Sequence, residues 1–283
     1  MENIVFFLQS LSQYQYLQNA LKAGILVGII CGLIGCFIIL RGMALMGDAI
    51  SHSVLPGVAI AYILGFSFFI GAVIAGVISA LGIGYVAQNS KIKDDSAIGI
   101  IFTAAFALGV ILITVNRGTE VCLWHILFGN VLAVSSNDLL MTFIIGIIVI
   151  ITVTLFYKQL LLTTFDPIMA ESIGIPAKTV HYFLMLLLSL VTVASLQTVG
   201  IILVVAMLIT PGASAYLLTN RLPIMIILAS IFGVISAIAG VYFSYIYDIP
   251  TGASIVVVAS IIFALSFFLS PNQKFILSIV NKN

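Results

Sequence analysis

The sequence predicts an all-α polytopic membrane protein with about eight or nine transmembrane helices. Hydrophobic residues make up 63% of the 283 residues and charged residues only 7%, whereas a soluble domain carries about 25% charged residues. Apolar runs of about 20 residues, each long enough to cross a bilayer as a helix, follow one another along the chain. No large hydrophilic segment separates them, so residues 1–283 are predicted to form a single transmembrane domain surrounded by membrane lipid.

The composition also excludes several classes of function. A net charge of +1 gives no indication of a nucleic-acid partner. The sequence contains no GxxxxGK[ST] phosphate-binding loop and no hydrophilic segment that could form a soluble catalytic domain. Any ATP-driven process would therefore need a second chain that binds the nucleotide.

The N-terminal residues 1–19 are polar and rich in tyrosine, and they lack the positively charged start of a signal peptide. They are predicted to form an interfacial segment rather than a span. Hydropathy then predicts spans at 20–40, 48–66, 68–88, 97–116, 138–157, 179–197, 199–219, 223–246 and 252–270.

One segment, 118–137, contains too many polar residues to span the bilayer, and we expect it to be re-entrant or interfacial. Small residues recur at helix-packing spacing in two of the predicted spans and indicate close helix contacts (Gly24, Gly28 and Gly32; Ala72, Gly76, Ala80 and Gly84).

The distribution of basic residues predicts the orientation. With the 158–178 loop inside the cell, only Lys22 and Arg117 face outward. Short cytoplasmic loops carry an excess of lysine and arginine, so the C-terminus is expected in the cytoplasm. The basic residues on that side are Arg41, Lys91, Lys93, Lys158, Lys178, Arg221, Lys274 and Lys282.

Asp48 and His52 are two ionisable residues that lie inside a predicted apolar span. Residues four apart on a helix share one face, and ionisable residues within the bilayer are costly and usually line a site or a pathway. The pair could bind a cation, or it could simply be hydrogen-bonded inside the bundle. Two ligands are too few for Mn²⁺ or Zn²⁺, so the metal hypothesis requires a two-fold homodimer. Pro56 and Gly57 are expected to distort the same helix.

The depth of this pair is open, because Asp48 follows Arg41 by only about 10 Å of helix.

The polar segment 158–178 joins two spans on the predicted cytoplasmic side. Asp166 can cap a short helix that has Pro167 at its first position, and Gly174 can end it. Met169 and Ile173 would then be available for contact with another protein. An ordinary connecting loop is the alternative interpretation.

Two other positions are candidates for a gate or for the point where an ion enters. Pro211, followed by glycine, is predicted to break a span, and a kink for packing is favoured over a gate. Asp248 falls in an outer turn, YDIPTGAS, where a solvated residue or helix cap is favoured over a role in ion entry.

The stretch RGMALMGDAISHSVLPGVAIA (41–61) resembles the signature of permease subunits of the manganese/zinc/iron class of ABC importers (ABC-3 type). The resemblance continues through LWHILFGNVLAVSSNDL (123–139), TTFDPIMAESIGIP (163–176), LQTVGIILVVAMLITPGASAYLL (196–218) and YDIPTGASIVVVAS (247–260). It covers essentially the whole chain and is strongest to the manganese permeases of Gram-positive bacteria.

This resemblance implies the fold of the cobalamin-type (type II) importers. It also implies a pore formed by two permease copies, two cytoplasmic ATP-binding subunits, and an extracellular metal-binding protein that delivers the ion. By motif, Asp48 and His52 would contact the metal. Residues 163–176 would form the coupling helix that docks on the ATPase, through Asp166, Pro167, Met169, Glu171, Ile173 and Gly174.

The predicted function is import of a divalent metal across the bacterial plasma membrane, with Mn²⁺ as the favoured ion and Zn²⁺ or iron as alternatives. The metal would be cargo rather than a permanently bound cofactor, and the chain itself would not be an enzyme. A proton-coupled carrier that uses Asp48 and His52 as a relay is a more remote alternative. An intramembrane metalloenzyme is another, although no third ligand or HExxH motif is present.

Overall fold

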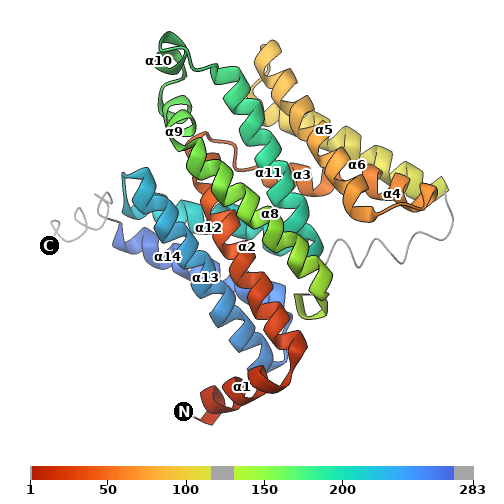
Figure 1. The fold of residues 1–283 in the computed structure, drawn as a ribbon, viewed down its shortest axis with the longest axis vertical. Helices are drawn as coiled ribbons and strands as arrows, with labels where there is room; N and C mark the ends of the chain where they lie inside the picture. Colours follow the sequence, from red (N-terminus) through yellow and green to blue (C-terminus); the bar gives the residue numbers. More distant parts are fainter. Residues whose placement is uncertain (1, 116–130, 271–283) are drawn as a thin grey trace, which may run out of the picture.

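A computed structural model describes residues 2–115 and 131–270 of the chain, and all the regular structure in these ranges is helical (Figure 1). The helices are α1 (Glu2–Gln13), α2 (Gln15–Leu40), α3 (Met46–Ser53), α4 (Leu55–Leu64), α5 (Phe68–Asn89), α6 (Asp94–Val115), the short 3₁₀ helix η1 (Val131–Ala133), α8 (Ser136–Leu155), α9 (Tyr157–Phe165), α10 (Pro167–Ser172), α11 (Ala177–Val199), α12 (Ile201–Leu218), α13 (Leu222–Tyr247) and α14 (Thr251–Leu269).

Within the described ranges, nine stretches are long and apolar enough to cross a membrane. Each coincides with one of the nine spans that hydropathy predicts, with ends that differ by a few residues, so the all-α polytopic fold is confirmed. The span at Met46–Leu64 is made of two helices, α3 and α4, which meet at Val54. Most of the segment 118–137 lies outside the described residues.

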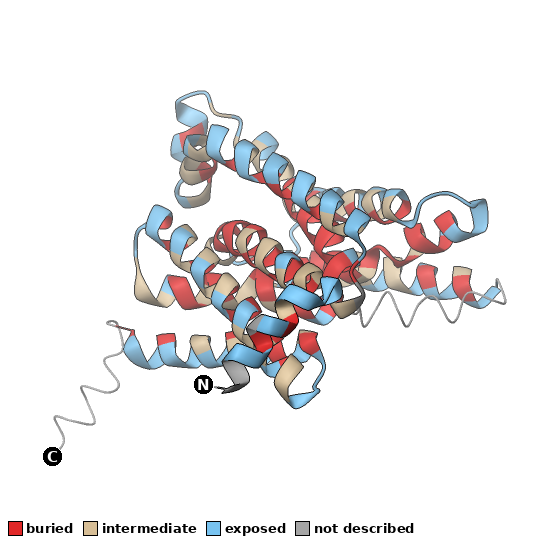
Figure 2. Ribbon diagram, turned by 60° about the horizontal axis from the view of Figure 1, so that its bottom comes forward, coloured by how far each residue is buried: buried red, intermediate tan, exposed pale blue. Residues whose placement is uncertain are grey.

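Helix α2 lies at the centre of one half of the molecule, where it packs against α8, α11, α12 and α13. Buried residues are concentrated where these helices face one another (Figure 2). A Cβ atom on Gly28 would lie 2.7 Å from the carbonyl carbon of Gly233 on α13, so the two backbones touch here. Two further positions of the predicted small-residue stripe, Gly24 and Gly32, face α13 in the same way, as expected for helices that pack through small residues.

Helices α3 to α6 form a second group beside this half (Figure 1). Helix α11 connects the two groups, because it packs against α2, α3, α5 and α8. Pro56 is the second residue of α4 and has no N–H to donate to the carbonyl of His52, which explains the interruption between α3 and α4. The expected distortion of this helix is confirmed.

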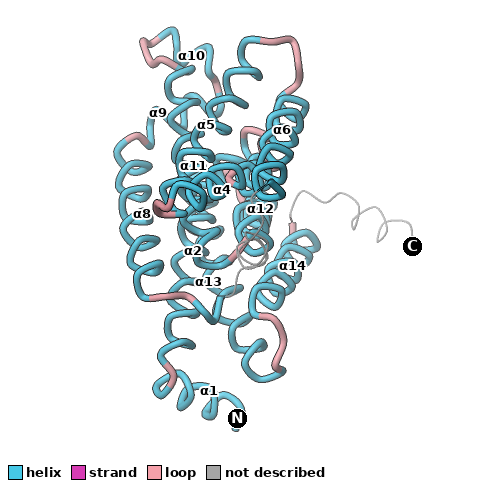
Figure 3. Tube along the Cα trace, turned by 90° about the vertical axis from the view of Figure 1, so that its right-hand side faces the viewer, coloured by secondary structure: helices cyan, strands magenta, loops and turns pink. Residues whose placement is uncertain are grey.

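The two ends of the molecule differ. Helices α9 and α10 lie at one end and α1 at the other (Figure 3). Tyr14, in an extended conformation with φ −106° and ψ 112°, separates α1 from α2, and α1 turns away from the α2 axis. An interfacial location of residues 1–19 stays a prediction.

Candidate functional site

The candidate site lies on α3, an eight-residue helix that is surrounded by α5, α6, α11 and α12. Gly47 lets α3 approach α12, because a Cβ atom there would lie 2.7 Å from Cδ1 of Leu208. Most of α3 is buried: Met46 and Ile50 are fully covered. A short helix packed this tightly holds its side chains in defined positions.

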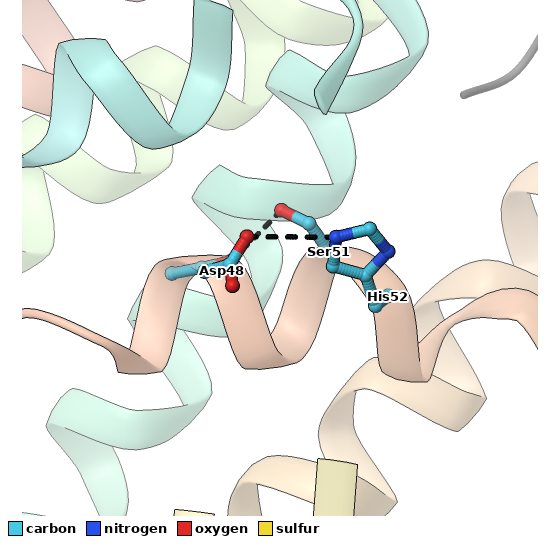
Figure 4. A network of polar contacts seen from close by, with 4 residues as sticks. Asp48, Ser51 and His52 are labelled. Carbon is cyan, nitrogen blue, oxygen red and sulfur yellow. Dashed lines mark hydrogen bonds and ion pairs between the residues drawn. The ribbon is translucent and has the colours of Figure 1, made fainter. Parts of the chain in front are cut away.

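Asp48 and His52 point toward each other along one side of α3 (Figure 4). Oδ1 of Asp48 lies 3.5 Å from Nε2 of His52, and the exposed fractions of the two side chains are 44% and 27%. Ser51, between them, donates its hydroxyl to the carbonyl of Gly47 at 2.8 Å. The helical spacing therefore brings the carboxylate and the imidazole together, as predicted, and both side chains remain accessible in the single chain.

Two phenylalanines from α6 hold the imidazole ring. The centroid of Phe102 lies 5.5 Å from that of His52, and Phe106 meets the ring edge to face at 5.6 Å. Nδ1 of His52 is buried, and no residue in the described parts of the chain forms a hydrogen bond with it. The apolar contacts thus restrict the ring to an orientation in which Nε2 faces Asp48.

The geometry of the pair suits a shared ion. Two ligands at about 2.1 Å from one metal are separated by about 3.0 Å in an octahedral arrangement and about 3.4 Å in a tetrahedral one. The observed 3.5 Å is close to these values. The described residues contain no group of three or more His, Cys, Asp or Glu side chains that could hold a metal. One copy of the chain therefore offers two ligands at this point.

The segment 163–176 contains the short helix α10 that the sequence predicts. Oδ1 of Asp166 accepts a hydrogen bond from the Met169 N–H at 2.9 Å and caps the helix, and Pro167 is its first residue. Gly174 has a φ of +86°, and the N–H of Ile175 bonds back to Ala170. This local structure agrees with the expectation.

Several side chains around α10 face away from the protein. Met169 and Ile173 are about half exposed, Glu171 is exposed, and Ile168 is 82% exposed. Phe165 adds a further exposed apolar side chain directly before the helix. No sequence pattern indicates a contact role for Ile168 or Phe165, although both lie in the segment 158–178.

The model of the ABC 3 transport family matches residues 13–270. The chain belongs to the ABC 3 transport family. It is 72% identical over 273 residues to the manganese transport system membrane protein MntC of Halalkalibacterium halodurans, which covers 96% of this chain and 94% of that protein.

Solved structures agree with this assignment. PsaBC from Streptococcus pneumoniae in complex with Fab contains a chain that is 48% identical, with a TM-score of 0.86 over 99% of this chain and 100% of that one. A more distant structure, assigned to the metal-chelate type of ABC transporter in an inward-facing conformation, is 16% identical. It has a TM-score of 0.70 over 89% of this chain and 85% of that one, and it shares the fold. The ABC 3 family member is thus a multi-pass protein of the bacterial plasma membrane.

The structure differs from the expectation at Pro211 and agrees with it at Asp248. Pro211 is buried inside α12, which runs unbroken from Ile201 to Leu218, so the predicted break does not occur. The next residue, Gly212, lies against the backbone of Gly35 on α2, which supports the helix where the proline removes a hydrogen bond. Asp248 is exposed and ends α13 in a left-handed conformation with φ 51° and ψ 45°, as a helix cap would. A gating or ion-entry role for either residue stays a prediction.

Two phenylalanines from α6 complete the surroundings of the site. Phe102 and Phe106 are spaced four apart on α6, a pattern that many apolar helices share, so no sequence signal marked them. The sequence marks Arg41 as a basic residue at the predicted cytoplasmic end of a span but does not indicate its hydrogen-bond partners. Its side chain is half-buried and forms three hydrogen bonds, and burial lowers the pKa of Arg41 to about 10.

Proposed function

We propose that the chain is the membrane-spanning subunit of an ATP-driven importer that brings Mn²⁺ into the cell. The observation that carries this proposal is the Asp48–His52 pair, held 3.5 Å apart on an interrupted helix within a bundle of the ABC 3 transport family. The name of the 72% identical relative supports manganese as the ion.

The site would be completed by a second copy of the chain. A carboxylate and an imidazole from each copy supply four ligands around a two-fold axis, and water can fill the remaining positions of an octahedral ion. Oxygen and nitrogen ligands without thiolates suit an ion that must enter and leave, since soft sulfur ligands favour Zn²⁺ or Cu⁺. A transport site has to bind well enough to admit the ion and weakly enough to release it.

Two further partners belong to the proposal. An extracellular metal-binding protein delivers the ion, and two ATP-binding subunits drive its passage. Helix α10, with its exposed Ile168, Met169 and Ile173, contacts the ATP-binding subunit on the cytoplasmic side. The C-terminus lies on that same side, in agreement with the distribution of lysine and arginine.

The experiment measures cellular metal content by mass spectrometry in cells that lack their own manganese importer. The cells express this chain with its cognate ATP-binding and metal-binding proteins. Wild type is expected to restore manganese, and the Asp48→Ala/His52→Ala double variant is not. Asp95→Ala, an exposed carboxylate in the first turn of α6, is the matched control and is expected to behave as wild type.

Each other result changes the proposal in a defined way. Restoration of zinc or iron in place of manganese would support an ABC importer but show that Mn²⁺ is not the imported ion. Equal manganese content with wild type and the double variant would show that the ion does not pass Asp48 and His52. Manganese uptake without the ATP-binding subunit would contradict an ATP-driven mechanism.

A further inference from the structure

Arg41 lies where α2 ends and the connection to α3 begins. It is the C-cap residue of α2, and the next residue, Gly42, has a φ of +69°. The N–H groups of Gly42 and Met43 bond back to Ile39 and Ile38 at 3.1 and 3.0 Å, which closes a tight turn. Residues 41–45 are therefore a short connection between α2 and the helix that carries the proposed metal ligands.

The guanidinium of Arg41 binds three side chains that lie more than 120 residues further along the sequence. Nε donates to Oγ1 of Thr164 at 3.1 Å, and one terminal nitrogen donates to Oγ1 of Thr163 at 2.8 Å. The other terminal nitrogen lies 3.3 Å from Nδ1 of His181 on α11. Thr163 and Thr164 are in the last turn of α9, which ends at Phe165, one residue before Asp166, the residue that caps α10.

The direction of these bonds is determined by the chemistry of the partners. The hydroxyls of Thr163 and Thr164 donate to the carbonyls of Gln159 and Leu160 at 2.8 and 2.6 Å. Each therefore has only lone pairs to offer Arg41. An arginine cannot accept, so Nδ1 of His181 is the unprotonated acceptor in the third bond. Three acceptors are arranged around one planar donor, a geometry that a lysine ammonium cannot reproduce.

A cavity of about 510 Å³ lies beside this cluster. Its lining includes Arg41 from the end of α2, Asp94 from the start of α6, and Pro167 and Glu171 from α10. Helices α9 and α10 pack against each other and against α11. The Arg41 hydrogen bonds thus join the α9–α10 unit to the 41–45 connection at the edge of an open space.

We propose that Arg41 is a positioning residue that transmits movement of α9 and α10 to α3, and so couples the ATP cycle to the Asp48–His52 site. This inference rests on the proposed function, in which α10 contacts the ATP-binding subunit. A displacement of the last turn of α9 pulls Arg41 through two hydrogen bonds. Because only residues 42–45 separate Arg41 from α3, the displacement reaches the ligand-bearing helix.

The test uses the complete transporter, with its ATP-binding subunit and metal-binding protein, in proteoliposomes. The quantity measured is the number of Mn²⁺ ions taken up per ATP hydrolysed. Arg41→Lys keeps the positive charge and removes the planar fork. We expect the ratio to fall about tenfold, within the range typical of coupling between two sites, while ATP turnover and the amount of co-purified ATP-binding subunit stay at the wild-type level.

Two further variants make the test specific. Arg221→Lys, the same change at an exposed arginine before α13, is the matched control and should leave the ratio unchanged. Thr163→Val removes an acceptor while it keeps the shape of a buried β-branched side chain. It should lower the ratio in the same direction, and the Arg41→Lys/Thr163→Val double variant should be no worse than Arg41→Lys alone, because both changes break one connection.

An unchanged ratio in Arg41→Lys and Thr163→Val would overturn the proposal. Loss of ATP turnover and of subunit association together with uptake in both variants would also overturn it, because Arg41 would then serve assembly. Effects that multiply in the double variant would show that the two residues act separately and would also overturn the proposal. A wild-type complex that hydrolyses ATP without moving Mn²⁺ would instead contradict the proposed function.

Discussion

The contact between α4 and α5 allows a prediction with a magnitude. Gly57 on α4 faces Gly71 on α5, and a Cβ atom on Gly57 would overlap the carbonyl oxygen of Gly71 and lie 2.6 Å from the Cβ atom of Ala75. Since carbon atoms pack at about 3.5–4.0 Å, Gly57→Ala would have to push the two helices apart by about 1 Å.

The energy of this change has two parts. Overpacking of a tight contact costs about 1–3 kcal/mol. Replacing a helical glycine with alanine gains up to about 1 kcal/mol on its own. Gly57→Ala is therefore expected to destabilise the protein by about 1–2 kcal/mol in total, and at roughly 2–4 °C per kcal/mol the melting temperature should fall by several degrees.

The assay is thermal unfolding of the purified permease in detergent, followed by intrinsic fluorescence. Gly82→Ala on α5 is the matched control, because a Cβ atom there would meet nothing within 4 Å. Its melting temperature should stay the same or rise slightly. If Gly57→Ala unfolds at the same temperature as Gly82→Ala, backbone contact does not determine the α4–α5 spacing and the reasoning is wrong.

Three other predictions follow from the site and from α10. Asp166→Ala removes the hydrogen bond that caps α10 at Met169, a change that costs about 1 kcal/mol. It should weaken binding of the ATP-binding subunit about fivefold in a titration. Asp166→Asn keeps a capping side chain and should not weaken binding. Ile168→Glu places a charge on a side chain that is 82% exposed, so it should reduce co-purification of that subunit without lowering the melting temperature. Phe106→Ala removes the edge-to-face contact with His52. It should weaken Mn²⁺ binding by about 10–100-fold in equilibrium dialysis, because loss of a residue that orients a metal-binding side chain typically has this effect.

Much of the fold could be predicted from the sequence because its causes are local. A run of about 20 apolar residues forms a helix in lipid whatever surrounds it, and this is why the predicted spans match the observed ones. The interruption at Val54 follows from Pro56, two residues away. The meeting of Asp48 and His52 follows from the helical repeat.

The surroundings of the site depend on contacts that no local pattern encodes. Arg41 contacts Thr163, which lies 122 residues further along the sequence. No sequence pattern indicates that Arg41 will meet the hydroxyls of Thr163 and Thr164. Pro211 shows the converse: its helix-breaking tendency is local, but α12 continues through it, and the next residue packs against α2. The second copy of the chain, which would complete the metal site, is inferred from the shortage of ligands and not from a sequence pattern.

The short length of α3 has a consequence for how the protein is made. Helices of fewer than about 12 residues are marginal on their own, and the α3–α4 stretch has the lowest mean hydropathy of the spans in the described residues. When this stretch leaves the translocon, its composition favours a helix in lipid less strongly than the composition of the other spans does. Packing against α5, α6, α11 and α12 then stabilises it. The part of the chain that carries Asp48 and His52 is therefore expected to acquire its structure late in biogenesis, after most of the bundle is already in place.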